Sequence, residues 1–159
     1  MTNKKVATNM IKKDLLFLNY NDECDTSAKD AYTRYAKRYN WDLSKASNFA
    51  PRKLLYARAV TPEGYSPWFV AHSNFISADD SNGKWLNRFE NDLLFEEWLP
   101  DSSHLKRELT ADNTRRIVFA KKSSGKYYFM GVYEPINIKR NAEGNFVKTY
   151  KRVSLVYPF

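Results

Sequence analysis

Apolar and polar residues follow two different periods along the chain, and each period predicts a different element. Between residues 27 and 39 the apolar residues recur every three or four positions, which is typical of a helix with one buried face. They are Ala28, Ala31, Tyr32, Tyr35, Ala36 and Tyr39. The preceding Asp25-Thr26-Ser27 offers an N-cap for this helix. A similar spacing, ended by Pro100, predicts a second helix near 86–99.

The last third of the chain shows the shorter period of β-strands. The predicted strands cover residues 116–121, 126–134, 136–139 and 146–156. The first two are joined by a short turn that contains Gly125, which is typical of a hairpin. Pro135 permits a corner between the second strand and the third. Consecutive strands with tight turns predict an antiparallel meander.

Two more strands are predicted upstream, over 54–60 and 68–72, with a turn at 61–64 between them. The chain as a whole, 1–159, then forms a single domain. Its N-terminal helical segment covers 1–50, and a mainly β part with the second helix covers 51–159. The expected fold class is α+β, with a curved antiparallel sheet or small open β-barrel and one or two flanking helices.

Composition places the chain among folded globular proteins. Hydrophobic residues make up 43% of it and aromatic residues 16%, with only 5 glycines and 6 prolines. No run approaches the roughly 18 apolar residues of a membrane span, so we expect no membrane partner. A single cysteine, Cys24, cannot form an internal disulfide, which favours a reducing compartment. The expected location is cytoplasmic, in a bacterium or an infecting phage.

The net charge of +8 is unevenly distributed. Residues 1–78 carry a net charge of +5, residues 79–112 carry −5, and residues 113–159 carry +8. The C-terminal strands therefore hold as much excess positive charge as the whole chain. Such a concentration favours a polyanionic partner. The alternative is a solvated strand face that the acidic segment partly neutralises.

Few residues suggest catalysis. Two histidines, His72 and His104, and the one cysteine, Cys24, are too few for a four-ligand zinc site. The sequence has no Gly-rich phosphate loop and no Walker lysine. The carboxylates of 90–101 fall on the solvent face of the predicted second helix. We therefore expect a protein that is not an enzyme and that needs no cofactor or metal.

Aromatic residues beside basic ones form the remaining functional signal. A base-binding site needs flat rings for stacking, amide or backbone groups for the base edge, and cations for phosphates. Candidate rings are Trp68, Trp85, Tyr127 and Tyr133. Candidate cations are Arg115, Arg116, Lys121, Lys122, Lys126, Lys148, Lys151 and Arg152. Candidate edge-binding groups are Ser73, Asn74 and Asn87. The competing interpretation is that each tryptophan is a core residue.

Gly131 lies in the middle of the predicted strand 126–134, where a glycine marks a bulge or a close approach of another group. It would make room for a neighbouring ring or a ligand, or it would serve as a barrel-corner kink. Regular alternation along this strand predicts that Tyr127, Phe129 and Tyr133 share one face with Gly131.

The order of motifs resembles the compact PUA-like barrels, which include EVE, YTH and SRA-type readers. The motifs are YSPWFVAHSNFI, GKWLNRFENDLLFEEWL, RRIVFAKKSSGKYYFMGVYEP and KTYKRVSLVYPF. The resemblance rests mainly on 116–156 and is closest to versions attached to bacterial restriction endonucleases and helicases. It implies a curved barrel that accepts a flipped, often modified base. It also implies Trp68 and Trp85 as pocket walls and the 121–126 turn as a phosphate-contacting loop.

Two hypotheses of function follow. The first is a non-catalytic nucleic-acid-binding protein, of DNA rather than RNA, which reads a modified or flipped base in an aromatic pocket. Its basic C-terminal meander would contact the phosphates. The second is a phage- or mobile-element-encoded inhibitor that binds a host defence protein through its charged surface. An enzyme with a site near His72 is a third and weaker interpretation.

Overall fold

The computed structural model describes residues 17–42, 59–71, 73–75, 85–98 and 114–159. Within these ranges it contains one α-helix and eight β-strands. In chain order they are β1 (Leu18–Asn19), α2 (Ala28–Tyr39), β2 (Ser66–Val70), β3 (Trp85–Glu90), β4 (Leu93–Trp98), β5 (Arg116–Lys121), β6 (Tyr127–Arg140), β7 (Phe146–Ser154) and β8 (Val156–Tyr157).

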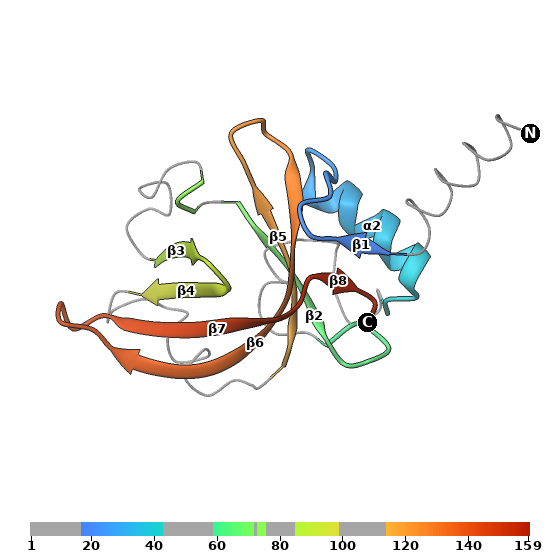
Figure 1. The fold of residues 1–159 in the computed structure, drawn as a ribbon. Helices are drawn as coiled ribbons and strands as arrows, with labels where there is room; N and C mark the ends of the chain where they lie inside the picture. Colours follow the sequence, from blue (N-terminus) through green and yellow to red (C-terminus); the bar gives the residue numbers. More distant parts are fainter. Residues whose placement is uncertain (1–16, 43–58, 72, 76–84, 99–113) are drawn as a thin grey trace, which may run out of the picture.

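Six strands form one sheet in the order β2-β5-β6-β7-β4-β3, which curls into a half-barrel (Figure 1). Strands β1 and β8 form a separate two-stranded ribbon. The meander of β5, β6 and β7 is antiparallel, as predicted. The curved sheet with a flanking helix is therefore confirmed. It is not wholly antiparallel, because β2 pairs in parallel with β5. The long stretch of chain between those two strands allows the crossover that a parallel pair requires.

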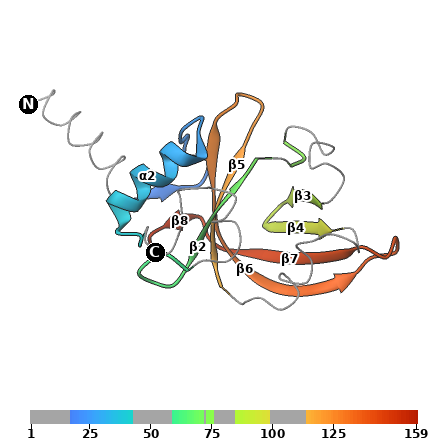
Figure 2. The same cartoon turned by 180° about the vertical axis from the view of Figure 1, so that it is seen from behind.

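Helix α2 agrees closely with the predicted helix over 27–39. The Ser27 side chain caps its N-terminus by accepting a hydrogen bond from the Asp30 N–H. Asn40 ends it in the left-handed conformation, at φ 58°. Its buried face packs on the sheet, where the Tyr35 ring stacks on Phe119 with centroids 5.6 Å apart. Figure 2 shows α2 beside β2 and β8, at the opposite end of the molecule from β3 and β4.

The core has two layers, one on each side of the central strands. The helix-side layer contains Tyr32 and Tyr35 from α2 with Phe69, Phe119 and other residues of the sheet. The concave layer lies inside the curl and joins residues of β3, β4 and β7 to those of β2, β5 and β6. Residues 116–120 are all buried because β5 contributes to both layers.

The predicted helix near 86–99 is wrong, since this segment forms a hairpin of β3 and β4. Asn91 adopts a positive φ of 55° in the two-residue turn between the strands. Each strand carries a polar residue in the row that faces the interior. Asn87 is buried beside Phe89 on β3, and its partner Glu96 lies between the buried Leu94 and Trp98 on β4. These polar positions interrupt the alternation of a strand and leave a spacing that imitates a helix.

Two other boundaries differ from the prediction. Pro135 makes no corner that ends a strand, because β6 continues through it to Arg140 with a register shift at Ile136. The predicted final strand, 146–156, is divided into β7 and β8. The predicted strand over 54–60 lies almost wholly outside the described residues. No helix in the described ranges is both long enough and apolar enough to cross a membrane.

Candidate nucleic-acid interface

Gly131 lies where strand β6 passes close to strand β7. Its φ of 122° belongs to a region that side chains rarely adopt. A Cβ atom here would lie 2.7 Å from the Ser154 carbonyl oxygen and 3.0 Å from Cδ of Arg152. The predicted close approach is therefore confirmed. The neighbours are a backbone carbonyl and the aliphatic stem of Arg152.

A β-bulge accompanies this glycine. Val118 of β5 is paired with Gly131, whereas the next residue, Phe119, is paired with Phe129. Met130 is therefore the extra residue on β6. The bulge reverses the alternation of side chains beyond it, and it adds local twist to a sheet that has to curl.

The face assignment predicted for β6 is wrong beyond this bulge. Tyr127 and Phe129 belong to the helix-side layer, but Tyr133 belongs to the concave layer. Val132, which regular alternation places opposite them, lies with Tyr127 and Phe129 instead. A single extra residue accounts for the exchange.

The concave layer contains a largely buried group of charged and aromatic side chains, which we name the inner cluster: Trp68, Glu96, Arg116, Lys148 and Tyr150. The guanidinium carbon of Arg116 lies 5.3 Å from the Trp68 ring centroid and 5.6 Å from that of Tyr150. The Lys148 ammonium lies 5.3 Å from the Tyr150 centroid. The Tyr150 hydroxyl donates to Glu96 Oε1 at 3.0 Å.

Four residues of the inner cluster are buried, and only Glu96 among its members is partly exposed. Arg116 is 1% exposed and Lys148 is 2% exposed, although both carry a charge that is costly to bury. The faces of the neighbouring rings offset part of that cost. Glu96 offsets more of it, because it lies opposite Lys148 in the pairing of β4 with β7. These residues include the rings and cations that base recognition needs, but in this structure they pack against one another.

The predicted pocket rings are mostly core residues. Trp68, Tyr127 and Tyr133 are buried, at 3%, 6% and 0% exposure. Burial also raises the pKa of Tyr133 and Tyr127. Trp85 begins β3 opposite Trp98, and its side chain lies outside the described part of the structure. The three described rings are therefore not exposed for stacking in this conformation.

Asn74, which we predicted to bind the edge of a base, instead pairs with β3, the last strand of the sheet. Its Nδ2 donates to the Phe89 carbonyl at 3.1 Å, and its Oδ1 accepts from the Phe89 N–H at 2.9 Å. The amide thus pairs with β3 as a neighbouring strand would. Such a contact protects an edge strand, and a base would have to displace both hydrogen bonds to use this amide.

The two adjacent arginines at the start of β5 point to different surroundings: Arg115 precedes the strand and Arg116 is its first residue. Arg116 enters the inner cluster, whereas Arg115 is partly exposed. The Arg115 guanidinium donates to the Tyr65 hydroxyl at 3.2 Å and forms an ion pair with Glu134 at 3.5 Å. These two partners raise its pKa. Neither arginine extends freely into solvent.

The lysines of the 121–126 turn also have partners within the chain. Lys126 forms an ion pair with Glu23, and Lys121 lies 6.0 Å from the Tyr127 ring centroid. Lys122 donates to Asn21 Oδ1 at 2.6 Å. The predicted basic loop is therefore tied to the loop that follows β1.

Residues of this turn join others from β6, β7 and the loop after β1 to form a partly exposed group, which we name the rim cluster. Its members are Tyr20, Asn21, Lys122, Tyr128 and Arg152. The Lys122 ammonium lies 4.9 Å from the Tyr128 centroid, and the Arg152 guanidinium carbon lies 4.7 Å from the Tyr20 centroid. The Tyr20 side chain is substantially exposed, at 45%. Partial burial lowers the pKa of Lys122.

Arg152 is held firmly in the rim cluster. Its Nε donates to the Met130 carbonyl at 2.9 Å and its Nη2 donates to the Tyr133 hydroxyl at 3.0 Å. These two hydrogen bonds fix the plane of the guanidinium, and its remaining N–H groups, on Nη1 and Nη2, are of the kind that binds a phosphate. Lys151, the neighbouring predicted cation, is exposed on the outer face of β7. Of the rim cluster, sequence reasoning named Lys122 and Arg152 but missed Tyr20 and Tyr128.

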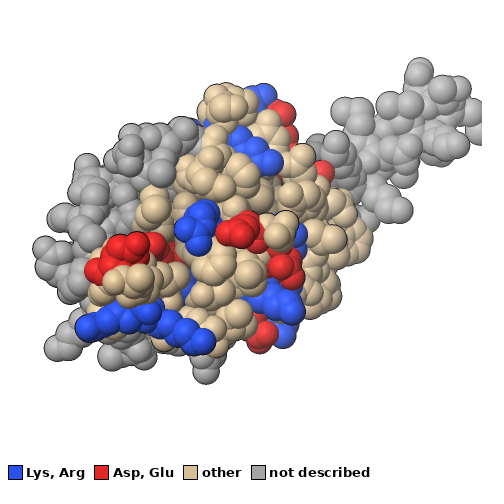
Figure 3. Space-filling model, turned by 60° about the vertical axis from the view of Figure 1, so that its left-hand side comes forward, with Lys and Arg blue, Asp and Glu red and all other residues tan. Residues whose placement is uncertain are grey.

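The surface charge is mixed. On the face shown in Figure 3, Lys and Arg side chains lie between acidic ones and do not form one continuous patch. Several cations therefore have their charge balanced locally, as the pairs of Arg115 and Lys126 show. A polyanion would make separate contacts with individual cations on this surface.

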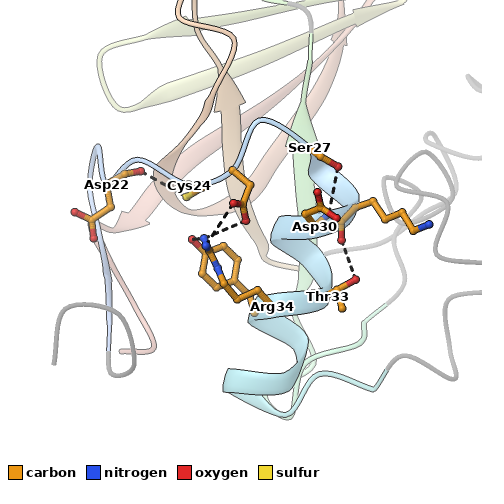
Figure 4. Close-up of polar contacts among 9 residues, drawn as sticks. Asp22, Cys24, Ser27, Asp30, Thr33 and Arg34 are labelled. Atoms are coloured by element: carbon orange, nitrogen blue, oxygen red, sulfur yellow. Dashed lines mark hydrogen bonds and ion pairs between the residues drawn. The ribbon is translucent and has the colours of Figure 1, made fainter. Parts of the chain in front are cut away.

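Cys24 lies beside α2 and has no catalytic features. Its thiol donates to the Asp22 carbonyl at 3.5 Å (Figure 4). Burial raises the pKa of the thiol to about 11, so it stays protonated at neutral pH and is a poor nucleophile. No three His, Cys, Asp or Glu side chains in the described ranges are grouped to hold a metal. Both histidines, at 72 and 104, lie outside those ranges.

The curled sheet alone does not identify a family, because unrelated folds share this shape. The described geometry offers two candidate groups of residues, one buried and one partly exposed. Comparison with models of known protein families finds no match to this chain, and no curated protein shows significant similarity to it.

Proposed function

We propose that this chain is a non-catalytic nucleic-acid-binding protein that contacts its ligand through the rim cluster. The observation that carries the proposal is the pair of cations held over the faces of Tyr20 and Tyr128 at the protein surface. Aromatic rings with adjacent cations bind bases and phosphates together. The net charge of +8 favours association of the chain with a polyanion.

The rim cluster can supply contacts of two kinds. Arg152 is fixed by two hydrogen bonds, so its guanidinium does not have to be ordered when a phosphate binds. Lys122 offers a second cation beside the turn that carries Tyr20. Its ammonium donates to Asn21, the residue after Tyr20. The exposed face of Tyr20 can accept a base. We propose DNA as the first nucleic acid to test.

The PUA-like assignment belongs to the same proposal. The curled six-stranded sheet with one helix against it is compatible with a small open barrel of that kind. Recognition of a flipped or modified base would place the base among the inner cluster, where Trp68 and Tyr150 now pack 5.2 Å apart. That finer function requires the concave layer to open. It stays a prediction that depends on binding being found first.

A salt titration with labelled oligonucleotides tests the proposal. Binding should weaken linearly on a logarithmic salt scale, with a slope that reports the number of phosphates neutralised by the protein. The double variant Lys122→Gln, Arg152→Gln should reduce that slope by about 1 for each cation removed from a phosphate. The matched control is Lys29→Gln, Lys37→Gln, which removes the same charge from the exposed face of α2.

The two variants give a clear decision. Equal losses of affinity would mean that net charge alone drives binding, and the rim cluster would not be the interface. No binding of wild-type protein to any oligonucleotide at low salt would overturn the proposed function. Circular dichroism of each variant checks that folding is intact.

A second candidate function is supported by exposed apolar residues at and beside the β1–β8 ribbon. Phe17, Tyr20, Val153 and Leu155 expose between 37% and 53% of their surface. Exposed apolar side chains become functional evidence when they form one continuous patch, as at protein interfaces. The alternative is therefore an inhibitor that binds a host defence protein through this surface. It becomes the better hypothesis if oligonucleotides fail to bind at low salt.

A further inference from the structure

Tyr20 is presented on a rigid turn. The Asn19 N–H donates to Asp22 Oδ2 at 2.8 Å, and the Asp22 N–H donates to the Asn19 carbonyl at 2.9 Å. Asn21 adopts a positive φ of 69°, which completes the tight turn. The backbone that carries the ring is therefore held in place.

This turn is also tied to the main sheet and to the β1–β8 ribbon. The Tyr20 N–H donates to the Leu155 carbonyl at 2.8 Å, and the Asn21 N–H donates to the Phe129 carbonyl at 2.7 Å. The Phe129 N–H donates to the Asp22 carbonyl at 3.0 Å. An exposed ring with such anchoring loses little freedom when a flat ligand stacks on it.

The side chains near Tyr20 are apolar as well as basic. Leu155, which accepts the hydrogen bond of Tyr20, is 53% exposed. Val153 is the extra residue of a second register shift, between the pairs Val132–Ser154 and Tyr133–Arg152, and is 37% exposed. The surface beside Arg152 therefore offers apolar area, which phosphates do not cover.

A double helix presents chiefly phosphates and sugars to a surface of this kind, because its bases are stacked inside. An unpaired strand presents both phosphates and the faces of its bases. Only the second ligand can use the Arg152 guanidinium, the Tyr20 ring and the apolar side chains together.

We propose that the rim cluster selects single-stranded nucleic acid, with a base stacked on Tyr20 and its phosphate on Arg152. This inference rests on the proposed nucleic-acid-binding function and specifies its ligand. Lys122 and Tyr128, joined to the same loop through Asn21, form the adjoining contact for the next nucleotide.

The experiment compares three labelled DNA ligands by fluorescence anisotropy at low salt: a single strand, the duplex of the same sequence, and an abasic single strand of the same length. The single strand should bind more tightly than the other two. Tyr20→Ala should lower its affinity by between about 5-fold and 100-fold, because it removes one base-stacking interaction. The same variant should leave binding of the abasic strand unchanged. Tyr20→Phe keeps the ring and should keep the affinity.

Each outcome decides one question. Duplex binding as tight as single-strand binding would overturn the inference of strand type but keep the proposed function. Equal binding of abasic and normal strands would show that no base stacks, which also overturns the inference. Failure of all three ligands to bind would overturn the proposed function itself. Thermal melts of the Tyr20 variants show whether any loss of binding comes from unfolding.

Discussion

The inner cluster and the rim cluster are built from the same chemical pair, a cation over an aromatic ring. In the inner cluster Arg116 lies between Trp68 and Tyr150, and it is 1% exposed. In the rim cluster Arg152 lies over Tyr20, whose side chain is 45% exposed. The cation–ring distances are similar, but the surroundings differ completely.

The difference teaches that residue type does not separate a core contact from one that a ligand could reach. A buried cation has exchanged water for ring faces and hydrogen bonds, and its removal leaves those groups unsolvated. An exposed pair keeps its water, so a ligand can replace that water without disturbing the fold. We therefore expect the inner cluster to control stability and the rim cluster to control binding.

Replacing one aromatic residue in each cluster gives the largest contrast. Trp68→Ala should lower the free energy of unfolding by about 3–5 kcal/mol, because it leaves a cavity beside Arg116 and Tyr150. Tyr20→Ala should change it by only about 0.5 kcal/mol, as is usual at a surface position. Urea denaturation followed by circular dichroism measures both values. Equal destabilisation by the two changes would contradict the division between the clusters.

A change at Gly131 tests the connection between the clusters, because this residue seats the stem of Arg152. Gly131→Ala should lower the free energy of unfolding by about 2–3 kcal/mol through an unfavourable φ and a collision with the Ser154 carbonyl. The matched control is Gly125→Ala. Gly125 also has a positive φ, 84°, but has open space around it. Gly125→Ala should lower the free energy of unfolding by about 1 kcal/mol. A decrease of the same size for Gly131→Ala would mean that the close approach has no effect on stability.

The pH dependence of stability gives the smallest effect and extends the contrast to a buried group outside both clusters, the Cys24 thiol. Burial raises the pKa of Cys24 to about 11 from an ordinary value of 9.0. The stabilisation from the protonated thiol is therefore fully present below pH 9 and is lost as pH rises from 9 towards 11. The loss should be on the order of 2 kcal/mol. The urea midpoints of the wild type and of Cys24→Ala should converge as the pH rises through this range. Parallel curves would show that the Cys24 thiol is not the group whose ionisation lowers stability.

Local patterns predicted the elements whose contacts are local. Helix α2 has a cap, an apolar stripe and a stop signal within about fifteen residues of sequence, and β5 and β6 are joined by a short turn. The antiparallel pairing of β5 with β6 follows from that short turn. Gly131 also gave a correct signal, because a mid-strand glycine has few causes other than a bulge or a close approach.

The remaining features depend on residues far apart in the sequence. Asn87 and Glu96 face the interior because Lys148 and Arg116 lie there too, and no local pattern predicts that combination. The parallel pairing of β2 with β5 joins Trp68 to Val118, which are distant in the sequence. The turn residue Asn91 offered the one local signal of the hairpin that the helix-like spacing concealed.

The same limit applies to the candidate site. Sequence reasoning selected cations and rings by type, and it could not tell that Arg115 and Lys126 pair with acidic residues of the chain itself. It missed Tyr20 because that residue becomes part of a basic surface only when β7 brings Arg152 beside it. Exposure and pairing are properties of the folded chain, and they decide which residues remain available to a ligand.

The bulge at Met130 has a consequence for how this chain can vary in length. Loss of one residue from β6 near the bulge would restore strict alternation there, and Tyr133 would turn from the interior of the curl towards the helix. Arg152 would then lose the hydroxyl that holds it. Insertions and deletions should therefore be excluded from this strand even where substitutions are accepted. The number of residues between Phe129 and Tyr133 therefore matters to the structure of the rim cluster as much as the identity of its exposed side chains.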